Sequence, residues 1–275
     1  MKIIIATIFL FLAPLINGQT KMFNLREWPD PSIFNINQTS PHVPLASFDS
    51  AEEAVNRPFK ESPYFQSLNG IWKFFWAQRP EETPAEFYQP NYNIERWNEI
   101  NVPGNWQMQG FGHAKFRNVH QPFPKDPPHI PADYNPVGSY RTIFSVPQNW
   151  DGRRIFLHFE GVKSAAYIWL NGEEIGFNQG GMEEFEFDVT DVVKQGDNVL
   201  AVQVFRYSAQ TYLECQDMWR LSGIYRDVYL VSRPQTFIRD YYVRCTLDKR
   251  YKNAELLVDV DVHGPQSDLV GNKIR

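Results

Sequence analysis

The chain has 275 residues, enough for one or two domains with a hydrophobic core. Aromatic residues make up 15% of it and 20 residues are proline, a composition that favours strands and long ordered loops over helices. With 27 basic against 32 acidic residues, a formal net charge of −5 and no basic run, the chain is not expected to bind nucleic acid.

Residues 1–18 predict a secretory signal peptide. Lys2 supplies the positive start, an apolar segment runs from Ile3 to Ile16, and Gly18 is a small residue at the expected cleavage point. The apolar segment is too short for a membrane anchor, which needs about 18–20 apolar residues. We therefore expect a secreted or periplasmic product with no membrane association once the signal is removed.

Residues 19–62 are polar and proline-rich without a sustained period, and they predict an extended N-terminal arm. From Tyr64 onward the pattern changes to short alternating strands, and Asn171-Gly172 between two of them is a strong hairpin signal. No amphipathic helix longer than two turns interrupts the series. Residues 63–233 are therefore predicted to form an all-β, jelly-roll β-sandwich. The main strands are expected at residues 71–76, 138–146, 154–159, 165–170, 174–177, 185–189, 199–205 and 225–231.

A long stretch rich in glycine and proline, residues 110–139, lies within this series. A loop of this length in a compact domain is usually functional or disordered. The aromatic and polar side chains of Phe116, Asn118, His120 and Tyr134 favour the functional interpretation.

Residues 234–275 predict the start of a second β-domain. Two strands are expected there, at residues 237–246 and 254–262, and two strands cannot bury a core alone. We therefore expect this domain to be incomplete within the chain. The two cysteines, Cys215 and Cys245, are too few for a disulfide scaffold, and their spacing does not decide whether they pair, although two free thiols are favoured.

The stretch from Tyr212 to Val228 (YLECQDMWRLSGIYRDV) concentrates the candidate chemistry. It places Glu214, Gln216 and Asp217 next to Trp219. Carboxylates and amides bind sugar hydroxyls, and an aromatic ring packs against the C–H face of a pyranose. The composition of this stretch therefore indicates a sugar-binding site.

This stretch resembles a motif of the large bacterial β-galactosidases of glycoside hydrolase family 2. Six further segments, in the same order, resemble the N-terminal sugar-binding region of that family. They are Arg26–Trp28, Ser67–Trp72, Val102–Met108, Asn135–Tyr140, Phe159–Val162 and Trp169–Gly172.

The resemblance implies a jelly-roll domain (galactose-binding-like), an immunoglobulin-like β-sandwich of which residues 234–275 are the truncated start, and a (β/α)8 barrel. The nucleophile and acid/base glutamates are expected on the barrel, past residue 275, so no catalytic residue is expected in this chain. The chain is thus expected to be the N-terminal portion of an exported β-galactosidase that hydrolyses terminal non-reducing β-D-galactosides with retention. The 275-residue fragment alone is predicted to be inactive.

The resemblance also implies two site residues. Asp217 resembles the family carboxylate that contacts the 6-hydroxyl side of the galactosyl group and a bound sodium ion, and Asn118 resembles the loop amide that helps to hold the sugar. Sodium and magnesium ions, and a homo-oligomer of the intact enzyme, are further expectations. The sequence departs from the family at Cys215, where an acid is common, and at Phe116, where a tyrosine is common.

Simpler structural roles compete with these assignments. Asp217 can be a turn residue, and Trp219 is expected to pack rather than to serve as a sugar platform. Arg220 and Asp227 can form an internal ion pair, and a structural role is favoured for both. His113, His120, His129 and His158 show no metal-ligand spacing, so zinc is not expected.

Two other functions remain open at this level. A stand-alone carbohydrate-binding, lectin-like module is the main alternative, because a jelly roll is a common lectin scaffold. A hydrolase for β-glucuronides or β-mannosides is the other, although the QDMWR segment at residues 216–220 resembles the galactosidase branch.

Overall fold

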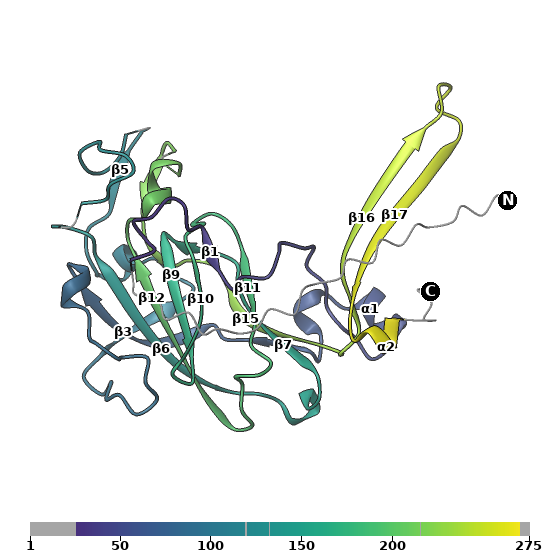
Figure 1. The fold of residues 1–275 in the computed structure, drawn as a ribbon, viewed down its shortest axis with the longest axis horizontal. Coiled ribbons are helices and arrows are strands. Elements are labelled where there is room, and N and C mark those ends of the chain that lie inside the picture. The colour runs from purple at the N-terminus through teal and green to yellow at the C-terminus, as the bar shows by residue number, and fades with distance from the viewer. Residues whose placement is uncertain (1–25, 119, 132, 215, 270–275) are drawn as a thin grey trace.

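The computed structural model describes residues 26–118, 120–131, 133–214 and 216–269. In these residues the chain forms two antiparallel sheets that pack as a sandwich, and a hairpin projects away from it (Figure 1). The seven-stranded sheet has the order β1 (Asn35–Ile36), β10 (Glu173–Asn178), β9 (Ala165–Leu170), β12 (Asp197–Phe205), β6 (Val137–Ser145), β3 (Gly70–Ala77) and β4 (Asn98–Val102). The four-stranded sheet has the order β11 (Phe185–Asp188), β7 (Arg154–Phe159), β15 (Val228–Arg233) and β2 (Phe65–Ser67).

The remaining elements are short. Three two-stranded pairs are β5 (Lys115–Arg117) with β13 (Met218–Arg220), β8 (Val162–Lys163) with β14 (Gly223–Ile224), and β16 (Phe237–Leu247) with β17 (Ala254–His263). The helices are α1 (Ala51–Asn56), α2 (Gln266–Leu269) and the 3-10 turns η1 (Phe59–Glu61), η2 (Pro80–Glu82), η3 (Trp106–Gln109), η4 (Gln148–Trp150) and η5 (Ala209–Tyr212). No helix of the described chain is both long and apolar enough to cross a membrane.

The predicted all-β sandwich is confirmed, and several strands begin and end where the sequence pattern places them. The predicted strands at 154–159 and 165–170 coincide with β7 and β9. Asn171 and Gly172 join β9 to β10 with positive φ values of 55° and 89°, the backbone that a two-residue hairpin turn of this twist requires. Six short strands, β1, β2, β5, β8, β13 and β14, were not predicted as such, because three residues or fewer carry no measurable period.

Strand β9 is buried on both faces, which explains its unbroken apolar sequence AAYIWL. Ala166, Ile168 and Leu170 point into the core between the two sheets, where Trp72, Tyr140 and Phe159 also lie. Ala165, Tyr167 and Trp169 belong to a second core on the outer face of the larger sheet. This second core is covered by Trp28, Ile33 and Ile36 of the N-terminal arm and by Phe87 and Trp97.

The described part of the N-terminal segment, residues 26–62, lies along the sandwich. β1 adds to the edge of the larger sheet beside β10. Trp28 stacks on Phe205 with ring centroids 5.3 Å apart, and its backbone N–H donates to the Tyr167 hydroxyl at 3.1 Å. The predicted signal peptide at 1–18 and the first residues of the predicted arm lie outside the described residues, as does Cys215; Cys245 is exposed and is a free thiol.

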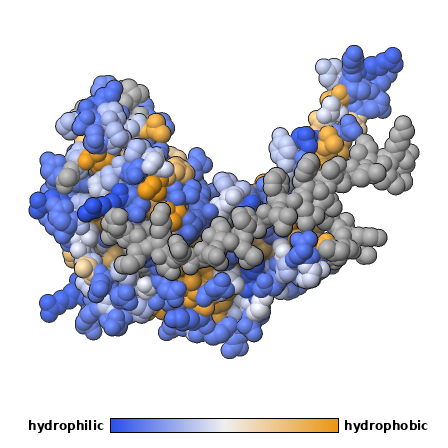
Figure 2. Space-filling view, in the orientation of Figure 1, coloured by the Kyte–Doolittle hydropathy of each residue, from blue (hydrophilic) through white to orange (hydrophobic). Residues whose placement is uncertain are grey.

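The hairpin β16–β17 extends beyond the sandwich with both faces open to solvent (Figure 1). Residues opposite each other in its register share a face, so one face carries Tyr241, Val243, Cys245, Leu247, Ala254, Leu256, Val258 and Val260. The opposite face is mostly polar. Figure 2 shows apolar surface along this hairpin beneath a hydrophilic tip.

Candidate functional site

The two sequence-predicted site residues lie side by side on a short ribbon at the end of the sandwich away from the hairpin β16–β17. Strand β5, labelled in Figure 1, pairs antiparallel with β13, and Met218 lies opposite Arg117 and Trp219 opposite Phe116. Asn118 directly follows β5 and Asp217 directly precedes β13, so the two residues lie at the same end of the antiparallel ribbon. Both are exposed. The structure therefore joins two segments about one hundred residues apart into one polar edge.

The buried side chain of Arg220 holds this edge by a hydrogen bond to its backbone. Arg220, at the end of β13, is 5% exposed, and its Nη2 donates to the Asn118 carbonyl at 2.6 Å. Asp227 pairs instead with Lys60 and with the Asn69 amide. Arg220 and Asp227 both have structural roles, as the sequence favoured, but with separate partners, so the possible ion pair between them is not formed.

Glu214 anchors the other side of the loop that carries Asp217. Its Oε1 accepts a hydrogen bond from the Gly181 backbone N–H at 2.5 Å. A Cβ at Gly181 would lie 2.6 Å from Glu214 Oε2, so a larger residue there would displace the Glu214 carboxylate from this contact. Burial raises the pKa of Glu214, and the nearby Lys163 charge and the Gly181 hydrogen bond oppose that rise. Glu214 thus acts as a structural anchor.

Trp219 is exposed rather than packed into the core as the sequence predicted. Its side chain is 56% exposed and meets Phe116, itself 52% exposed, edge-on with ring centroids 5.6 Å apart. The outer surface of the ribbon is therefore aromatic, whereas the neighbouring Met218 points to the other face, with its sulfur 3.9 Å from Lys163 Nζ. A polar edge beside exposed rings has the composition that a sugar requires.

The long proline-rich loop is ordered by contacts to the segment before β13. Phe123 packs edge-on against Tyr207 and Tyr212 at 5.0 and 5.5 Å. The Tyr212 hydroxyl donates to the His129 carbonyl at 2.7 Å. Asn135 is fully buried and exchanges two hydrogen bonds with the Tyr207 backbone, at 2.9 and 3.0 Å. The loop and the Tyr212–Val228 stretch therefore form one structural unit.

The edge offers only part of a cation site. Asp217 and Asn118 supply carboxylate and amide oxygens, which are suitable ligands for a hard cation. A full oxygen shell needs several more ligands. No group of three or more His, Cys, Asp or Glu side chains suited to a metal ion occurs in the described part of the chain. The residues present fit a sodium ion as a partial ligand set only.

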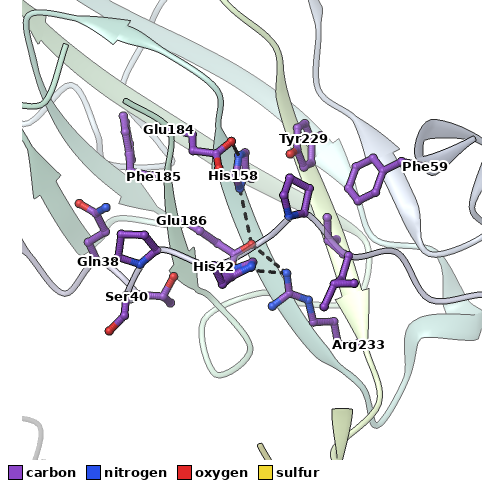
Figure 3. Close-up of a pocket in the computed structure, with 15 residues that line it drawn as sticks. Gln38, Ser40, His42, Phe59, His158, Glu184, Phe185, Glu186, Tyr229 and Arg233 are labelled. Atoms are coloured by element: carbon purple, nitrogen blue, oxygen red, sulfur yellow. Dashed lines mark hydrogen bonds and ion pairs between the residues drawn. The ribbon is translucent and has the colours of Figure 1, made fainter. Parts of the chain in front are cut away.

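A second polar cluster lies on the smaller sheet, around Glu186 (Figure 3). Its carboxylate is 3.0 Å from His42 Nε2, 3.3 Å from Arg233 Nη2 and 3.6 Å from His158 Nδ1. Burial opposes ionisation of Glu186, but hydrogen bonds from His158 and His42 and the Arg233 charge outweigh it and lower its pKa to about 2. Since His42 belongs to the N-terminal segment, this cluster ties that segment to β7, β11 and β15.

Neither this cluster nor the space behind the ribbon can enclose a sugar. The cavity at Glu186 and the cavity lined by Lys163, Arg206, Glu214 and Arg220 each measure about 20 Å³. That volume holds a water molecule, whereas ligand pockets measure about 300–1,000 Å³. The exposed ribbon is therefore the best candidate for sugar contact, as one wall of a site.

Sequence reasoning missed the anchoring roles of Glu214, Arg206 and Arg220 and the cluster around Glu186. For Glu214 and Arg220 the only available signal was their proximity to Asp217 in the Tyr212–Val228 stretch, and Arg206 lies before that stretch; the partners of all three lie in distant segments. No sequence pattern around His42 or Glu186 indicated that these two residues would meet.

Comparison with known proteins adds to this geometry. The family model described as "Glycosyl hydrolases family 2, sugar binding domain" matches residues 65–234. A protein named Beta-galactosidase from Priestia megaterium is 40% identical over 241 residues, which cover 86% of this chain and 23% of that protein. Another Beta-galactosidase, from Halalkalibacterium halodurans, is 38% identical over 241 residues, 86% of this chain and 24% of that protein.

A solved β-glucuronidase from Ruminococcus gnavus, in complex with D-glucaro 1,5-lactone, shares the fold. It aligns with a TM-score of 0.55 and 24% identity over 74% of this chain and 35% of that chain. At this identity the likeness concerns the fold alone. The chain spans about a quarter of the length of the two curated relatives.

Proposed function

Because this chain belongs to glycoside hydrolase family 2, whose sugar-binding domain covers residues 65–234, we propose that it is the N-terminal portion of a β-galactosidase. The intact enzyme would hydrolyse terminal non-reducing β-D-galactosides with retention, through two carboxyl groups on a barrel outside this chain. The choice of galactoside is supported by the relatives named Beta-galactosidase at 40% and 38% identity. We also propose that the protein is exported and that the intact enzyme assembles as a homo-oligomer.

One observation carries the proposal: the pairing of β5 with β13 brings Asp217 and Asn118 together on an exposed edge. The Asn118 amide can both donate to and accept from a sugar hydroxyl. The Asp217 carboxylate can accept from a hydroxyl and supply an oxygen to a sodium ion. A sodium ion held in part by Asp217 would supply positive charge that attracts sugar hydroxyl oxygens. A role for magnesium is proposed for the intact enzyme, with no ligand assigned in this chain.

Neither residue is assigned a proton-transfer or nucleophilic role. Asp217 is exposed, and it forms no pair with Glu214, whose carboxylate is held by Gly181. The chain therefore contributes binding and orientation, and the bond-breaking carboxylates come from elsewhere. It follows that the 275-residue chain alone should not turn over a galactoside.

The test is Asp217→Asn in the full-length enzyme. This substitution keeps the size of the side chain but removes its charge, so KM for a nitrophenyl β-galactoside should rise about tenfold, the loss expected for one charge-assisted hydrogen bond. The sodium concentration for half-maximal activity should rise as well. The thermal unfolding midpoint should not change, because Asp217 is exposed.

Asp191→Asn is the matched control, since Asp191 is an exposed acid in the turn between β11 and β12. It should leave KM and the sodium dependence unchanged. Identical kinetics for Asp217→Asn and wild type across the sodium range would remove Asp217 from the site.

A further inference from the structure

Two buried arginines lie beneath the exposed ribbon and hold backbone carbonyls from both of its strands. Arg220 donates to the Asn118 carbonyl at 2.6 Å. Arg206, at 2% exposure, donates through Nη2 to the His113 carbonyl at 2.9 Å and to the Arg220 carbonyl at 3.1 Å. The segments on either side of β5 and the end of β13 are thereby tied to one pair of guanidinium groups.

The other contacts that the described residues give the ribbon include Lys115 Nζ over the Tyr134 ring, 5.4 Å from its centroid, and Lys163 Nζ 3.9 Å from the Met218 sulfur. β5 and β13 have three residues each, and an isolated two-stranded ribbon is marginally stable in water. Phe116 and Trp219 lie on its outer surface and contribute little to the core. Hydrogen bonds from charged donors are about twice as strong as neutral ones, so the arginine contacts constrain this edge strongly.

The charge distribution behind the ribbon is suited to holding carbonyl oxygens. Lys163, Arg206 and Arg220 line the cavity there, and of its described lining residues only Glu214 carries a negative charge. Arg206 Nε and Nη1 are buried and form no hydrogen bond with the described residues. Burying a guanidinium is costly, and apolar side chains of similar volume serve packing as well or better. The positive charge is thus better explained by a role in orienting the backbone.

We propose that Arg220, supported by Arg206, is a positioning residue for sugar binding: it fixes the Asn118 backbone and so holds the Asn118 amide beside Asp217. This inference rests on the proposed function of Asp217 and Asn118. Glu214 fixes the opposite side of the same loop through Gly181, so Asp217 lies between two anchored positions, residues 214 and 220. The binding edge is therefore ordered before a sugar arrives, which reduces the entropy lost on binding.

The first measurement uses hydrogen–deuterium exchange on the 275-residue chain. Arg220→Met keeps much of the side-chain volume but removes the donors, and exchange in residues 113–118 should become faster. Arg141→Met is the matched control, because Arg141 is also buried and donates to backbone carbonyls, those of Phe87 and Gln89 at 2.8 and 3.0 Å. It should accelerate exchange near residues 87–90 and leave residues 113–118 unchanged.

The second measurement uses the intact enzyme with a nitrophenyl β-galactoside, well below the unfolding temperature of every variant. Arg220→Met should raise KM on the order of tenfold, the loss that one charge-assisted hydrogen bond represents. Arg220→Lys should recover part of this loss, because lysine keeps the charge but not the planar fork. Arg141→Met should lower the unfolding midpoint with no change in KM.

Unchanged exchange at residues 113–118 in Arg220→Met, or a KM no different from that of Arg141→Met, would overturn the positioning role. If the intact wild-type enzyme does not hydrolyse galactosides, the proposed β-galactosidase function is wrong. The exchange experiment then still decides whether Arg220 orders the edge, since it needs no substrate.

Discussion

Glu186 and Asp217 are both acids, but their surroundings give them different tasks. Glu186 is 4% exposed and faces His42, His158 and Arg233, so its charge is committed to protein partners. Asp217 lies exposed at the end of a ribbon, where its charge remains available to a sugar or an ion. The side chains that the fold places around each acid thus make Glu186 a structural carboxylate and leave Asp217 as a candidate binding carboxylate.

The lowered pKa of Glu186 predicts how stability depends on pH. Its pKa falls from the ordinary value of 4.5 to about 2 in the folded protein, so the unfolded chain takes up the proton first as the pH falls. The stabilisation is complete above about pH 4.5 and is lost between there and pH 2, and it amounts to about 3 kcal/mol. Urea unfolding at a series of pH values should show this loss.

Glu186→Gln should be less stable than wild type at pH 6 and should lose less further stability below pH 4.5. Glu99→Gln, which removes an exposed partner of Lys73, should retain the wild-type pH profile. A wild-type profile in Glu186→Gln would show that this carboxylate does not titrate as inferred.

The contribution of His158 to folding stability changes with pH in the opposite direction. Burial works against its charged form, but hydrogen bonds to Glu184 and Glu186 raise its pKa above the ordinary value of 6.5. Its contribution is complete below that value and is lost as the pH rises through the raised pKa. The cluster is therefore expected to be most stabilising at mildly acidic pH.

Among the elements, the hairpin β16–β17 is the one whose sequence pattern and surroundings disagree most. The alternation of apolar and polar residues along both strands is typical of a sheet with one buried face. Here the apolar face is open to solvent: Val243 and Val258, which lie opposite each other, are 49% and 45% exposed. Contiguous apolar surface of this kind favours association.

The isolated chain should therefore bind a hydrophobic fluorescent dye through this face. The double substitution Val243→Thr and Val258→Thr keeps the β-branched shape but makes the face more polar, so dye fluorescence and self-association should fall. Thr246→Ser with Glu255→Gln alters a cross-strand pair on the opposite face and should change neither. Equal dye binding by all three proteins would show that this face is not the exposed apolar surface.

At the scale of the whole molecule, two sheets bury a core between them while the candidate sugar contacts lie on a ribbon at one end. Core residues such as Trp72, Tyr140 and Phe159 hold the sandwich together and are remote from sugar chemistry. The ribbon supplies Asp217, Asn118 and exposed rings on one side only. This separation suits a domain that contributes one wall to a pocket shared with another domain.

The isolated 275-residue chain should accordingly give no heat of binding with millimolar galactose or lactose. One wall leaves most sugar hydroxyls in water, so the few contacts formed cannot offset the entropy lost on binding. Titration calorimetry makes the measurement, with the full-length enzyme as the positive control. Clear saturable binding by the chain alone would favour the lectin-like alternative.

Local chemistry explains how much the sequence could predict. Short runs of apolar and aromatic residues and the Asn171-Gly172 turn located β7, β9 and the β9–β10 hairpin, because strand-favouring composition and turn backbone depend only on near neighbours. The composition of the Tyr212–Val228 stretch indicated a sugar site, and its resemblance to a family motif singled out Asp217 within it. These features follow from residues a few positions apart.

Only the tertiary structure decided what surrounds those residues. The Arg220–Asn118 hydrogen bond spans 102 positions and the His42–Glu186 contact spans 144, and no local pattern encodes such pairings. Arg220, seven positions away, was a possible partner of Asp227, which instead pairs with Lys60, 167 positions away. Burial and partner choice depend on which strands the fold makes neighbours, so the sequence identified the candidate acid, and the packing of distant segments determined how it is held.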